Sequence, residues 1–418
     1  MAAISTDRCW RRSLERRMPK TLPKLSSLVT RIGGNRVDAW NIHAQASAAA
    51  ARGEDVIVLS VGDPEFAAPQ TVIERAVTAL RAGDTHYTTI IGRPALRERI
   101  ARLHQATSGQ SVDLSHVVVT SGAQNALFVA SLCLCERGDE VLVPEPLYLT
   151  YEATVRASDA TLVPVPVLPE TGFRLDLDAL RAAVTPRTRA IFLATPCNPT
   201  GVAMRRDELQ AVANLAIAHD LWVVSDEVYG SLVYESEHVS IASLDGMAQR
   251  TVTISSLSKS HAMAGFRLGW AIAPAELARH MGNLLLCMTY GAPGFVQDAA
   301  CQALDDYDTV TSTIRTIYRH RRDLVCGLLS DVPGLRCPVP EAGMFVLLDV
   351  RATGLTSSEV AWGLFRQTGV SVLDAQAFGP SAEGFLRMGL VVGDERLAEA
   401  CRRIKVYARA LQANGPSR

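Results

Sequence analysis

The sequence predicts an α/β protein in which a large domain, built on a seven-stranded and mostly parallel sheet, is joined to a smaller α+β domain. From about residue 117 to 274, short apolar runs alternate with segments of helical periodicity, which is typical of parallel strands joined by crossover helices. After residue 305 come a charged helix and two isolated apolar runs. A chain of 418 residues also exceeds the ~250–300 residues at which a single core stops growing, so two domains are expected.

The seven apolar runs supply the expected strands of the large sheet. They lie at residues 117–119, 140–143, 162–167, 190–194, 221–225, 251–255 and 268–273. Between two of them, Leu209, Val212 and Ala216 recur at helical spacing within residues 207–218. A helix there should cover one face of the sheet.

We expect a basic N-terminal tail at residues 1–36, a large domain at 61–305, and a small domain made of 37–60 and 306–418. The elements expected in the small domain are helices at about 37–52, 311–329 and 358–367 and strands at 344–350 and 385–391. Both ends of the chain would then complete one domain.

The composition argues against nucleic acids and membranes as partners. Lys and Arg total 42 against 43 Asp and Glu, so the formal net charge is −1 and there is no broad basic field. No apolar run approaches the ~18–20 residues of a membrane-spanning helix. The nine cysteines are odd in number and lie mostly among apolar residues, which indicates a reduced, cytoplasmic protein, and none has the spacing of a metal site. We expect small-molecule chemistry without a metal.

The strongest chemical signal is a loop rich in serine and glycine at residues 255–269, which holds Lys259 and, eight residues later, Arg267. This loop resembles the lysine signature of the class I/II aminotransferases, which are pyridoxal 5'-phosphate (PLP) enzymes of fold type I. A primary amine is required because only an amine forms an imine with the cofactor aldehyde. The resemblance implies that Lys259 carries PLP, that Arg267 forks onto its phosphate, and that Ser256 adds a hydroxyl donor.

A glycine-containing turn comes after the first expected strand and opens a helix. Free backbone amides at a helix N-terminus, aided by the helix dipole, favour an anion there. The resemblance implies that Gly122, Ala123 and Gln124 bind the cofactor phosphate at this turn.

Polar residues at the ends of later strands also match the family in chain order. The resemblance implies that Asn198 hydrogen-bonds the 3'-oxygen of the cofactor and that Tyr229 points its hydroxyl at the same atom. Asp226 would keep the pyridine nitrogen protonated, which makes the ring an electron sink. Glu227, next along the strand, should face the other way and serve a structural role, since alternate side chains leave a strand on opposite faces.

Tyr148 lies where this family stacks an aromatic ring on the cofactor, whereas Tyr151 is expected to pack. Arg387, a lone cation in an apolar run, demands an anionic partner. The resemblance supplies one, the substrate α-carboxylate, which Gly62 and Asn198 would also contact. Tyr87 resembles the tyrosine that reaches the phosphate of the other subunit, which implies a homodimer with shared active sites.

The stretches at residues 39–43, 60–64, 256–263 and 297–301 give the best overall resemblance, which is to the arginine:pyruvate transaminases. The transaminase that closes the pathway to enduracididine, a cyclic arginine derivative, is similar in logic, and the sequence does not separate the two. A guanidino substrate is thus implied, and its cation needs an acceptor. Asp38, Asp63 and Glu65 are candidates, and Trp40 offers a cation–π face.

The function that this resemblance implies is PLP-dependent transamination. The α-amino group would move by a ping-pong mechanism from an amino acid, arginine or a derivative of it, to a 2-keto acid such as pyruvate. The same residues would also suit a PLP-dependent lyase, decarboxylase or oxidase, since fold does not fix reaction type. A transcription regulator with an aminotransferase-like domain is disfavoured, because only about 36 residues precede the matched region.

Overall fold

The structure, a computed structural model, describes residues 23–33 and 40–413. Seven strands form the main sheet in the order β2-β8-β7-β6-β5-β3-β4. They are β2 (Val117–Thr120), β3 (Glu140–Glu145), β4 (Thr161–Pro166), β5 (Thr188–Ala194), β6 (Trp222–Asp226), β7 (Thr251–Ser256) and β8 (Gly269–Ile272). Only β8 runs against its neighbours β2 and β7 in this sheet. The predicted α/β class and mostly parallel sheet are confirmed, and each strand ends within two residues of its predicted bounds.

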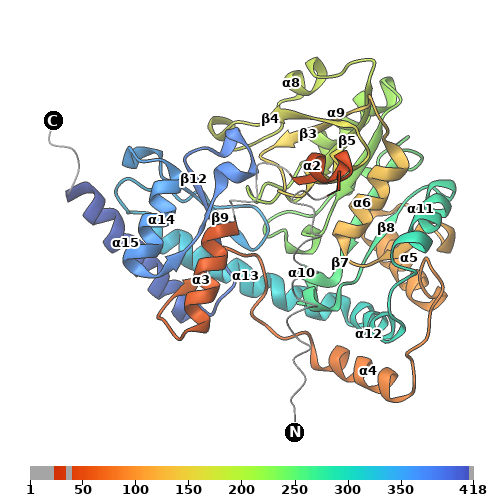
Figure 1. Cartoon of the computed structure of the whole chain (residues 1–418), viewed down its shortest axis with the longest axis horizontal. Helices are drawn as coiled ribbons and strands as arrows, with labels where there is room; N and C mark the ends of the chain where they lie inside the picture. The colour runs from red at the N-terminus through yellow and green to blue at the C-terminus, as the bar shows by residue number, and fades with distance from the viewer. Residues whose placement is uncertain (1–22, 34–39, 414–418) are drawn as a thin grey trace, which may run out of the picture.

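Helices cover both faces of this sheet (Figure 1), which is why its strands read as continuous apolar runs. One face packs on α6 (Ala123–Leu134), α7 (Tyr151–Ala157) and α11 (Ala275–Met288). The other face packs on α5 (Pro94–Ser108), α8 (Leu177–Ala182), α9 (Arg206–Ala218) and α12 (Gly294–Asp305). Helix α9 buries Leu209, Val212 and Ala216 against the sheet, as its spacing predicts.

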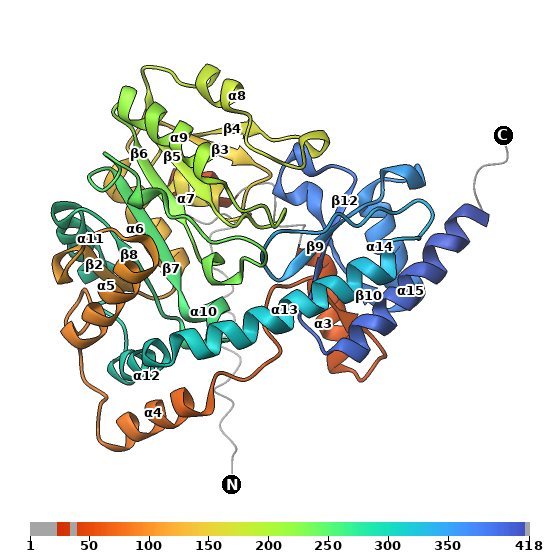
Figure 2. The ribbon, with the colours of Figure 1, turned by 180° about the vertical axis from the view of Figure 1, so that it is seen from behind.

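The second layer of structure is a small antiparallel sheet in the order β11-β12-β9. Its strands are β9 (Phe345–Asp349), β11 (Leu373–Asp374) and β12 (Phe385–Gly389), and its helices are α3 (Asn41–Ala51), α13 (Tyr307–Leu329), α14 (Ser357–Thr368) and α15 (Asp394–Ala413). The N-terminal segment joins this part, because β1 (Ile57–Val58) pairs with β10 (Val370–Ser371). Figures 1 and 2 show α3 beside α13 and α15, although α3 and α15 have colours from opposite ends of the scale.

Helix α13 links the two parts of the molecule. It runs from α12, beside the large sheet, to α15, which lies beside the small sheet (Figure 2). It begins at Tyr307, four residues before the predicted start at 311, and β12 ends at Gly389, two residues before the predicted end at 391. The exact domain boundaries at 60/61 and 305/306 stay a prediction.

Residues 27–33, within the predicted tail, form the short helix α2 (Ser27–Gly33). Its Arg31 pairs with Asp159, just after α7. The remaining helices that position the site are α4 (Gln70–Arg81) and the one-turn α10 (Leu257–Ser260). Across the part of the chain that the structure describes, no helix combines the length and the hydropathy needed to cross a membrane.

Candidate active site

A cavity of about 170 Å³ opens at the carboxyl ends of β5, β6 and β7. Parallel strands end at one edge of a sheet, which is where α/β proteins bind their ligands. Nine of the residues selected from the sequence line this cavity: Ala123, Gln124, Tyr148, Asn198, Asp226, Tyr229, Ser256, Lys259 and Arg267. The fold thus gathers side chains from five separate segments of the chain.

Lys259 lies on α10, directly after β7. Ser256 caps this one-turn helix, since its side chain accepts from the backbone N–H of Ser258. The Lys259 amine donates to the carbonyl of Gly62. Burial and the nearby cations of Arg387 and Arg267 lower the pKa of Lys259 to about 8. A fraction of the amine is therefore free of its proton near neutral pH, as a nucleophile or base requires.

Asp226 is a buried acid at the end of β6. Burial raises its pKa to about 6. Its carboxylate accepts from the hydroxyl of Tyr151 at 2.8 Å and from the backbone N–H of Val228 at 3.3 Å. A buried carboxylate with so few donors is a strong partner for a protonated ring nitrogen.

Tyr151 does more than the packing expected of it. The ring is buried edge-on against Phe192, and the hydroxyl reaches Asp226. The sequence held one usable signal, because a buried tyrosine hydroxyl normally needs a partner. It gave no means of finding which one, since the two residues are 75 positions apart.

The turn between β2 and α6 brings backbone amides close to Arg267. Gly122 has φ +84°, and a Cβ there would lie 2.5 Å from Nη2 of Arg267, so only glycine fits. The side-chain amide of Gln124 is hydrogen-bonded to Thr150 and Thr154. Its backbone N–H, rather than its side chain, is therefore the group available at this turn. A helix N-terminus beside a guanidinium suits a phosphate dianion.

Arg387 is a buried cation on β12, only 3% exposed. It donates to the Ser60 carbonyl at 2.8 Å and to the Asn198 side chain at 3.3 Å, while Nε has no partner. The rings of Phe345 and Phe378 lie 5.9 and 5.3 Å from the guanidinium carbon. No carboxylate pairs with it within residues 23–33 and 40–413, so an anion is needed from outside the chain.

Six residues selected from the sequence lie outside the cavity lining. Gly62, Gly122 and Arg387 adjoin the lining residues Lys259, Arg267 and Asn198, and the other three are Trp40, Glu65 and Tyr87. Trp40 is 38% exposed and packs edge-on against His43. The Glu65 carboxylate forms an ion pair with the buried Arg321. Tyr87 is 86% exposed at the surface, its ring 4.7 Å from that of Tyr290. Of the other acids named for a guanidinium, Asp63 is exposed and acts electrostatically on Lys259, while Asp38 lies outside the described residues.

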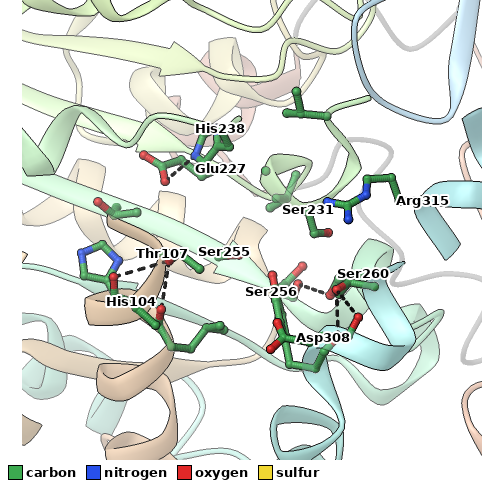
Figure 3. Close-up of a pocket in the computed structure, with 18 of the residues that line it drawn as sticks. His104, Thr107, Glu227, Ser231, His238, Ser255, Ser256, Ser260, Asp308 and Arg315 are labelled. Carbon is green, nitrogen blue, oxygen red and sulfur yellow. Dashed lines mark hydrogen bonds and ion pairs between the residues drawn. The ribbon is translucent and has the colours of Figure 1, made fainter. Parts of the chain in front are cut away.

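Glu227 points to the opposite face of the sheet, as strand alternation predicts. It accepts from Ser225 and Ser240, each at 2.8 Å, and pairs with His238 at 2.9 Å. Figure 3 shows this pair in a second cavity, of about 810 Å³, which Ser255, Ser256 and Ser260 of the lysine loop also line. Burial raises the pKa of Glu227, but His238 and the two hydroxyls outweigh it and leave the pKa below its usual value. These contacts support the structural role expected of Glu227.

An amine of lowered pKa, a buried acid and a phosphate cradle in one cavity define a class of protein that uses an aldehyde-bearing phosphate cofactor. Residues 54–404 match the family model for aminotransferase class I and II. The chain belongs to this family, whose members use PLP. The residues present fit that cofactor, since the helix N-terminus after Gly122 lies beside the Arg267 guanidinium, a combination that would suit its phosphate, and Lys259 lines the same cavity.

Relatives and solved structures agree with this assignment. The arginine–pyruvate transaminase AruH of Pseudomonas aeruginosa is 51% identical over 388 residues, which are 93% of this chain and 99% of the relative. An aspartate aminotransferase of Pyrococcus abyssi is 36% identical over 360 residues, or 85% and 92% of the two chains. The structure of Thermus thermophilus aspartate aminotransferase with maleate superposes with a TM-score of 0.87 at 32% identity, covering 92% of this chain and all of that one.

The lowered pKa of Lys259 predicts that its amine reduces the free energy of unfolding of the cofactor-free protein at neutral pH. Between pH 8 and 10.5 the amine is protonated in the unfolded chain only, so stability rises with pH across that window. We expect Lys259→Met to stabilise the cofactor-free protein at pH 7 by about 1–3 kcal/mol, and the gain to disappear as the pH rises through the window. Urea unfolding at several pH values measures this. Lys405→Met is the control, and an equal gain there would contradict the prediction.

Proposed function

We propose that this aminotransferase moves the α-amino group between a guanidino amino acid, L-arginine or an arginine-derived one such as enduracididine, and a 2-keto acid such as pyruvate. The observation that carries transamination of an α-amino acid is Arg387, a buried guanidinium without a carboxylate partner among the described residues, beside Lys259. The guanidino side chain is supported by the 51% identity to a transaminase named for arginine and pyruvate.

The proposed chemistry needs a cofactor and a base. When bound, PLP supplies an aldehyde that condenses with amines and a ring that accepts electron density from the substrate Cα. Lys259 holds the cofactor between turnovers and, once freed by the incoming amine, takes the Cα proton on Nζ. Its lowered pKa suits both tasks, because the neutral amine is accessible near pH 8.

The neighbours of Lys259 hold and polarise the ring. Asp226 keeps a proton on the ring nitrogen, and its own hydrogen bond from Tyr151 keeps its carboxylate ionised. Tyr229, Asn198 and Tyr148 line the same cavity; the first two would hydrogen-bond the 3'-oxygen, and the ring of Tyr148 would stack on the cofactor.

Different residues of the site hold the phosphate and the substrate. Arg267 and Ser256, with the amides of Gly122, Ala123 and Gln124, bind the phosphate. Arg387 binds the α-carboxylate with Asn198 and the backbone of Gly62, for the amino acid and then for the keto acid. One anion site thus serves both halves of a ping-pong reaction.

The guanidinium of the substrate is assigned to Trp40 and Glu65. The exposed ring of Trp40 offers a cation–π contact, which is worth about 0.5–2 kcal/mol. Glu65 already neutralises Arg321 through Oε1, so it would share its charge with the substrate. Contacts made from outside the cavity lining suit a site that must also admit pyruvate.

The proposed assembly is a homodimer with shared active sites. Tyr87 and Tyr290 form an aromatic pair exposed by 86% and 50%, and Leu286 and Met288 nearby on α11 are exposed by 46% and 42%. Exposed apolar groups gathered in this way mark an interface. In the dimer, Tyr87 would reach the phosphate bound by the partner.

The eight cysteines among the described residues are all free, which supports a reducing compartment such as the cytoplasm.

Single-turnover absorbance of the PLP form, mixed with one amino acid and no keto acid, tests the substrate proposal. We expect L-arginine and L-enduracididine to convert the enzyme to its pyridoxamine form at least about tenfold faster than neutral or acidic amino acids. Faster conversion by aromatic or acidic amino acids would remove the guanidino substrate. Ammonia or peroxide released without an acceptor would indicate a lyase or an oxidase, and released carbon dioxide a decarboxylase.

Mixed dimers test the shared active site. Lys259→Ala and Tyr87→Phe subunits should each form weakened or inactive homodimers. A mixed dimer contains one site with native Lys259 from one chain and native Tyr87 from the other. We expect it to regain about half of the wild-type activity and native cofactor affinity at that site. Activity no higher than the average of the two parents would contradict the crossing of Tyr87.

Tyr151→Phe tests the hydrogen bond to Asp226. Without that donor the ionised carboxylate is less stable, so the pKa of Asp226 rises. We expect the acidic limb of the pH–rate profile of the holoenzyme to move to higher pH, with kcat about tenfold lower near pH 6. Tyr234→Phe removes a buried hydroxyl that bonds the Gly343 carbonyl instead, and is the matched control. An unshifted profile in Tyr151→Phe would remove this role.

A further inference from the structure

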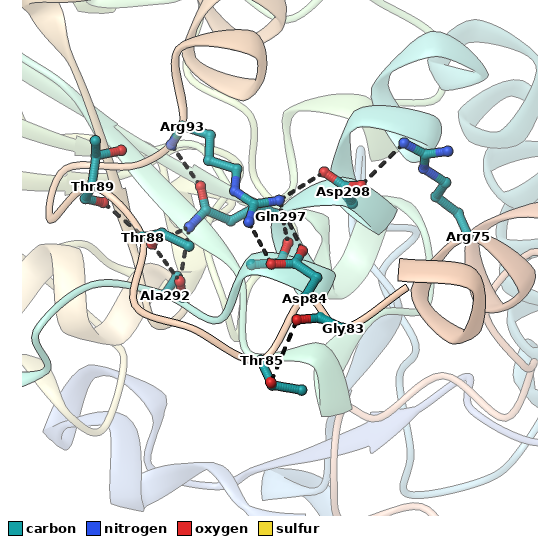
Figure 4. Close-up of polar contacts among 11 residues, drawn as sticks. Arg75, Gly83, Asp84, Thr85, Thr88, Thr89, Arg93, Ala292, Gln297 and Asp298 are labelled. Carbon is teal, nitrogen blue, oxygen red and sulfur yellow. Dashed lines mark hydrogen bonds and ion pairs between the residues drawn. The ribbon is translucent and has the colours of Figure 1, made fainter. Parts of the chain in front are cut away.

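The surface segment between α4 and α5 carries Tyr87 and is held by a group of polar side chains, here called the Arg93 cluster: Asp84, Arg93, Gln297 and Asp298 (Figure 4). Arg93 forks onto Asp84, with Nη1–Oδ2 and Nη2–Oδ1 distances of 2.8 and 2.5 Å. It also donates to Asp298 of α12 at 3.0 Å. The two ends of the segment are therefore tied to each other and to a neighbouring helix.

Gln297 holds the same segment from inside. Its side chain is fully buried and accepts from the backbone N–H of Arg93 at 2.7 Å. It donates to the Thr88 hydroxyl at 3.0 Å and to the Ala292 carbonyl at 2.8 Å. Thr88, the residue directly after Tyr87, also donates to Ala292. The oxygen and the nitrogen of the Gln297 amide both form hydrogen bonds, and these bonds hold the backbone of the segment in one conformation.

The helix α12 comes unusually close to this ion pair. A Cβ at Gly294 would clash with Oδ1 of Asp84 and Nη2 of Arg93, so a larger residue there would displace the ion pair. A bidentate pair held at a helix start is geometrically specific, unlike an ordinary surface ion pair.

The cluster contrasts with the residue that the segment presents. The side chains of Arg93, Asp84 and Asp298 are 32%, 17% and 27% exposed, whereas Tyr87 is 86% exposed. Tyr87 contributes little to the packing of its own chain. The segment is therefore fixed by hydrogen bonds and ion pairs while the Tyr87 ring that it carries is exposed. This suits a contact of Tyr87 with another molecule, because a side chain that is already held in place loses less entropy on binding.

We propose that Arg93 is a positioning residue that acts through Tyr87: the Arg93 cluster fixes the segment so that Tyr87 meets the cofactor phosphate of a second copy of this chain. This inference rests on the shared active site proposed above. The cluster does not line the cavity of its own chain, so its effect on the cofactor passes to the partner subunit.

The chain supplies a matched control for a purely structural role. Arg99 also ties α5 to α12, through a bidentate pair with Asp305 at 2.8 and 3.0 Å. Its side chain is 28% exposed, close to the 32% of Arg93. The Arg99 pair joins the two helices away from the segment that carries Tyr87, so Arg99→Gln removes an equivalent ion pair and leaves Tyr87 in place.

The experiment measures the apparent Kd of PLP for the dimeric enzyme, with dimer content and thermal stability recorded for each variant. We expect Arg93→Gln and Tyr87→Phe each to raise the Kd about tenfold, Arg99→Gln to leave it within about twofold, and Arg93→Lys to restore part of the affinity. The double variant should be no weaker than Tyr87→Phe alone, since both changes remove one contact. Asp84→Asn, which keeps the side-chain volume, replaces Arg93→Gln if that variant does not fold.

The outcomes separate this inference from the function on which it rests. An unchanged Kd in Tyr87→Phe would overturn the crossing of Tyr87 and the inference together. A raised Kd in Tyr87→Phe that Arg93→Gln and Asp84→Asn do not share would overturn the inference alone. Additive effects in the double variant, or an equal loss in Arg99→Gln, would also overturn it, because Arg93 would then act on general stability.

Discussion

The hydrogen-bonded pairing of β5, β6 and β7 is the constraint on which the site depends. Ala194 is in register with Asp226, and Asp226 with Ile254, so β5 and β6 end together and β7 ends two residues further on, at Ser256. Their carboxyl-terminal residues and connections therefore meet at one edge: the turn with Asn198, the acid Asp226, and the one-turn helix with Lys259. A shift of register by one residue would turn Asp226 to the other face of the sheet, where Glu227 now lies with His238.

The cavity concentrates charges that the folded chain does not neutralise. Arg387 and Lys259 are cations with few acceptors, and Asp226 is an acid kept from water. Such groups are unfavourable in an empty protein and become favourable when ions of the opposite charge enter. Binding of a phosphate-bearing cofactor and a carboxylate substrate, as proposed above, would recover stability lost at these three positions.

Outside the cavity, ion pairs fix the segments that approach it. Arg321 of α13 holds Glu65, four residues after Val61 and close to the loop of Gly62, and it also pairs with Asp394 of α15. Arg93 holds the segment of Tyr87 beside α12. In both places a buried or half-buried arginine joins segments that are more than 200 positions apart, and so couples surface loops to the neighbouring helices.

The sequence by itself determined the class of fold, the strands of the main sheet and nine of the residues that line the cavity. Local periodicity specifies strands and helices, and the short motifs around Gly122, Asn198, Asp226 and Lys259 each lie within a few residues of a strand end. Only the tertiary structure decided the partners: Tyr151 for Asp226, Arg321 for Glu65, and the Arg93 cluster. The first two of these contacts join positions 75 and 256 apart. Such partners are brought together only when the chain packs, because packing places residues side by side that are far apart in the sequence. A local sequence pattern therefore cannot predict them.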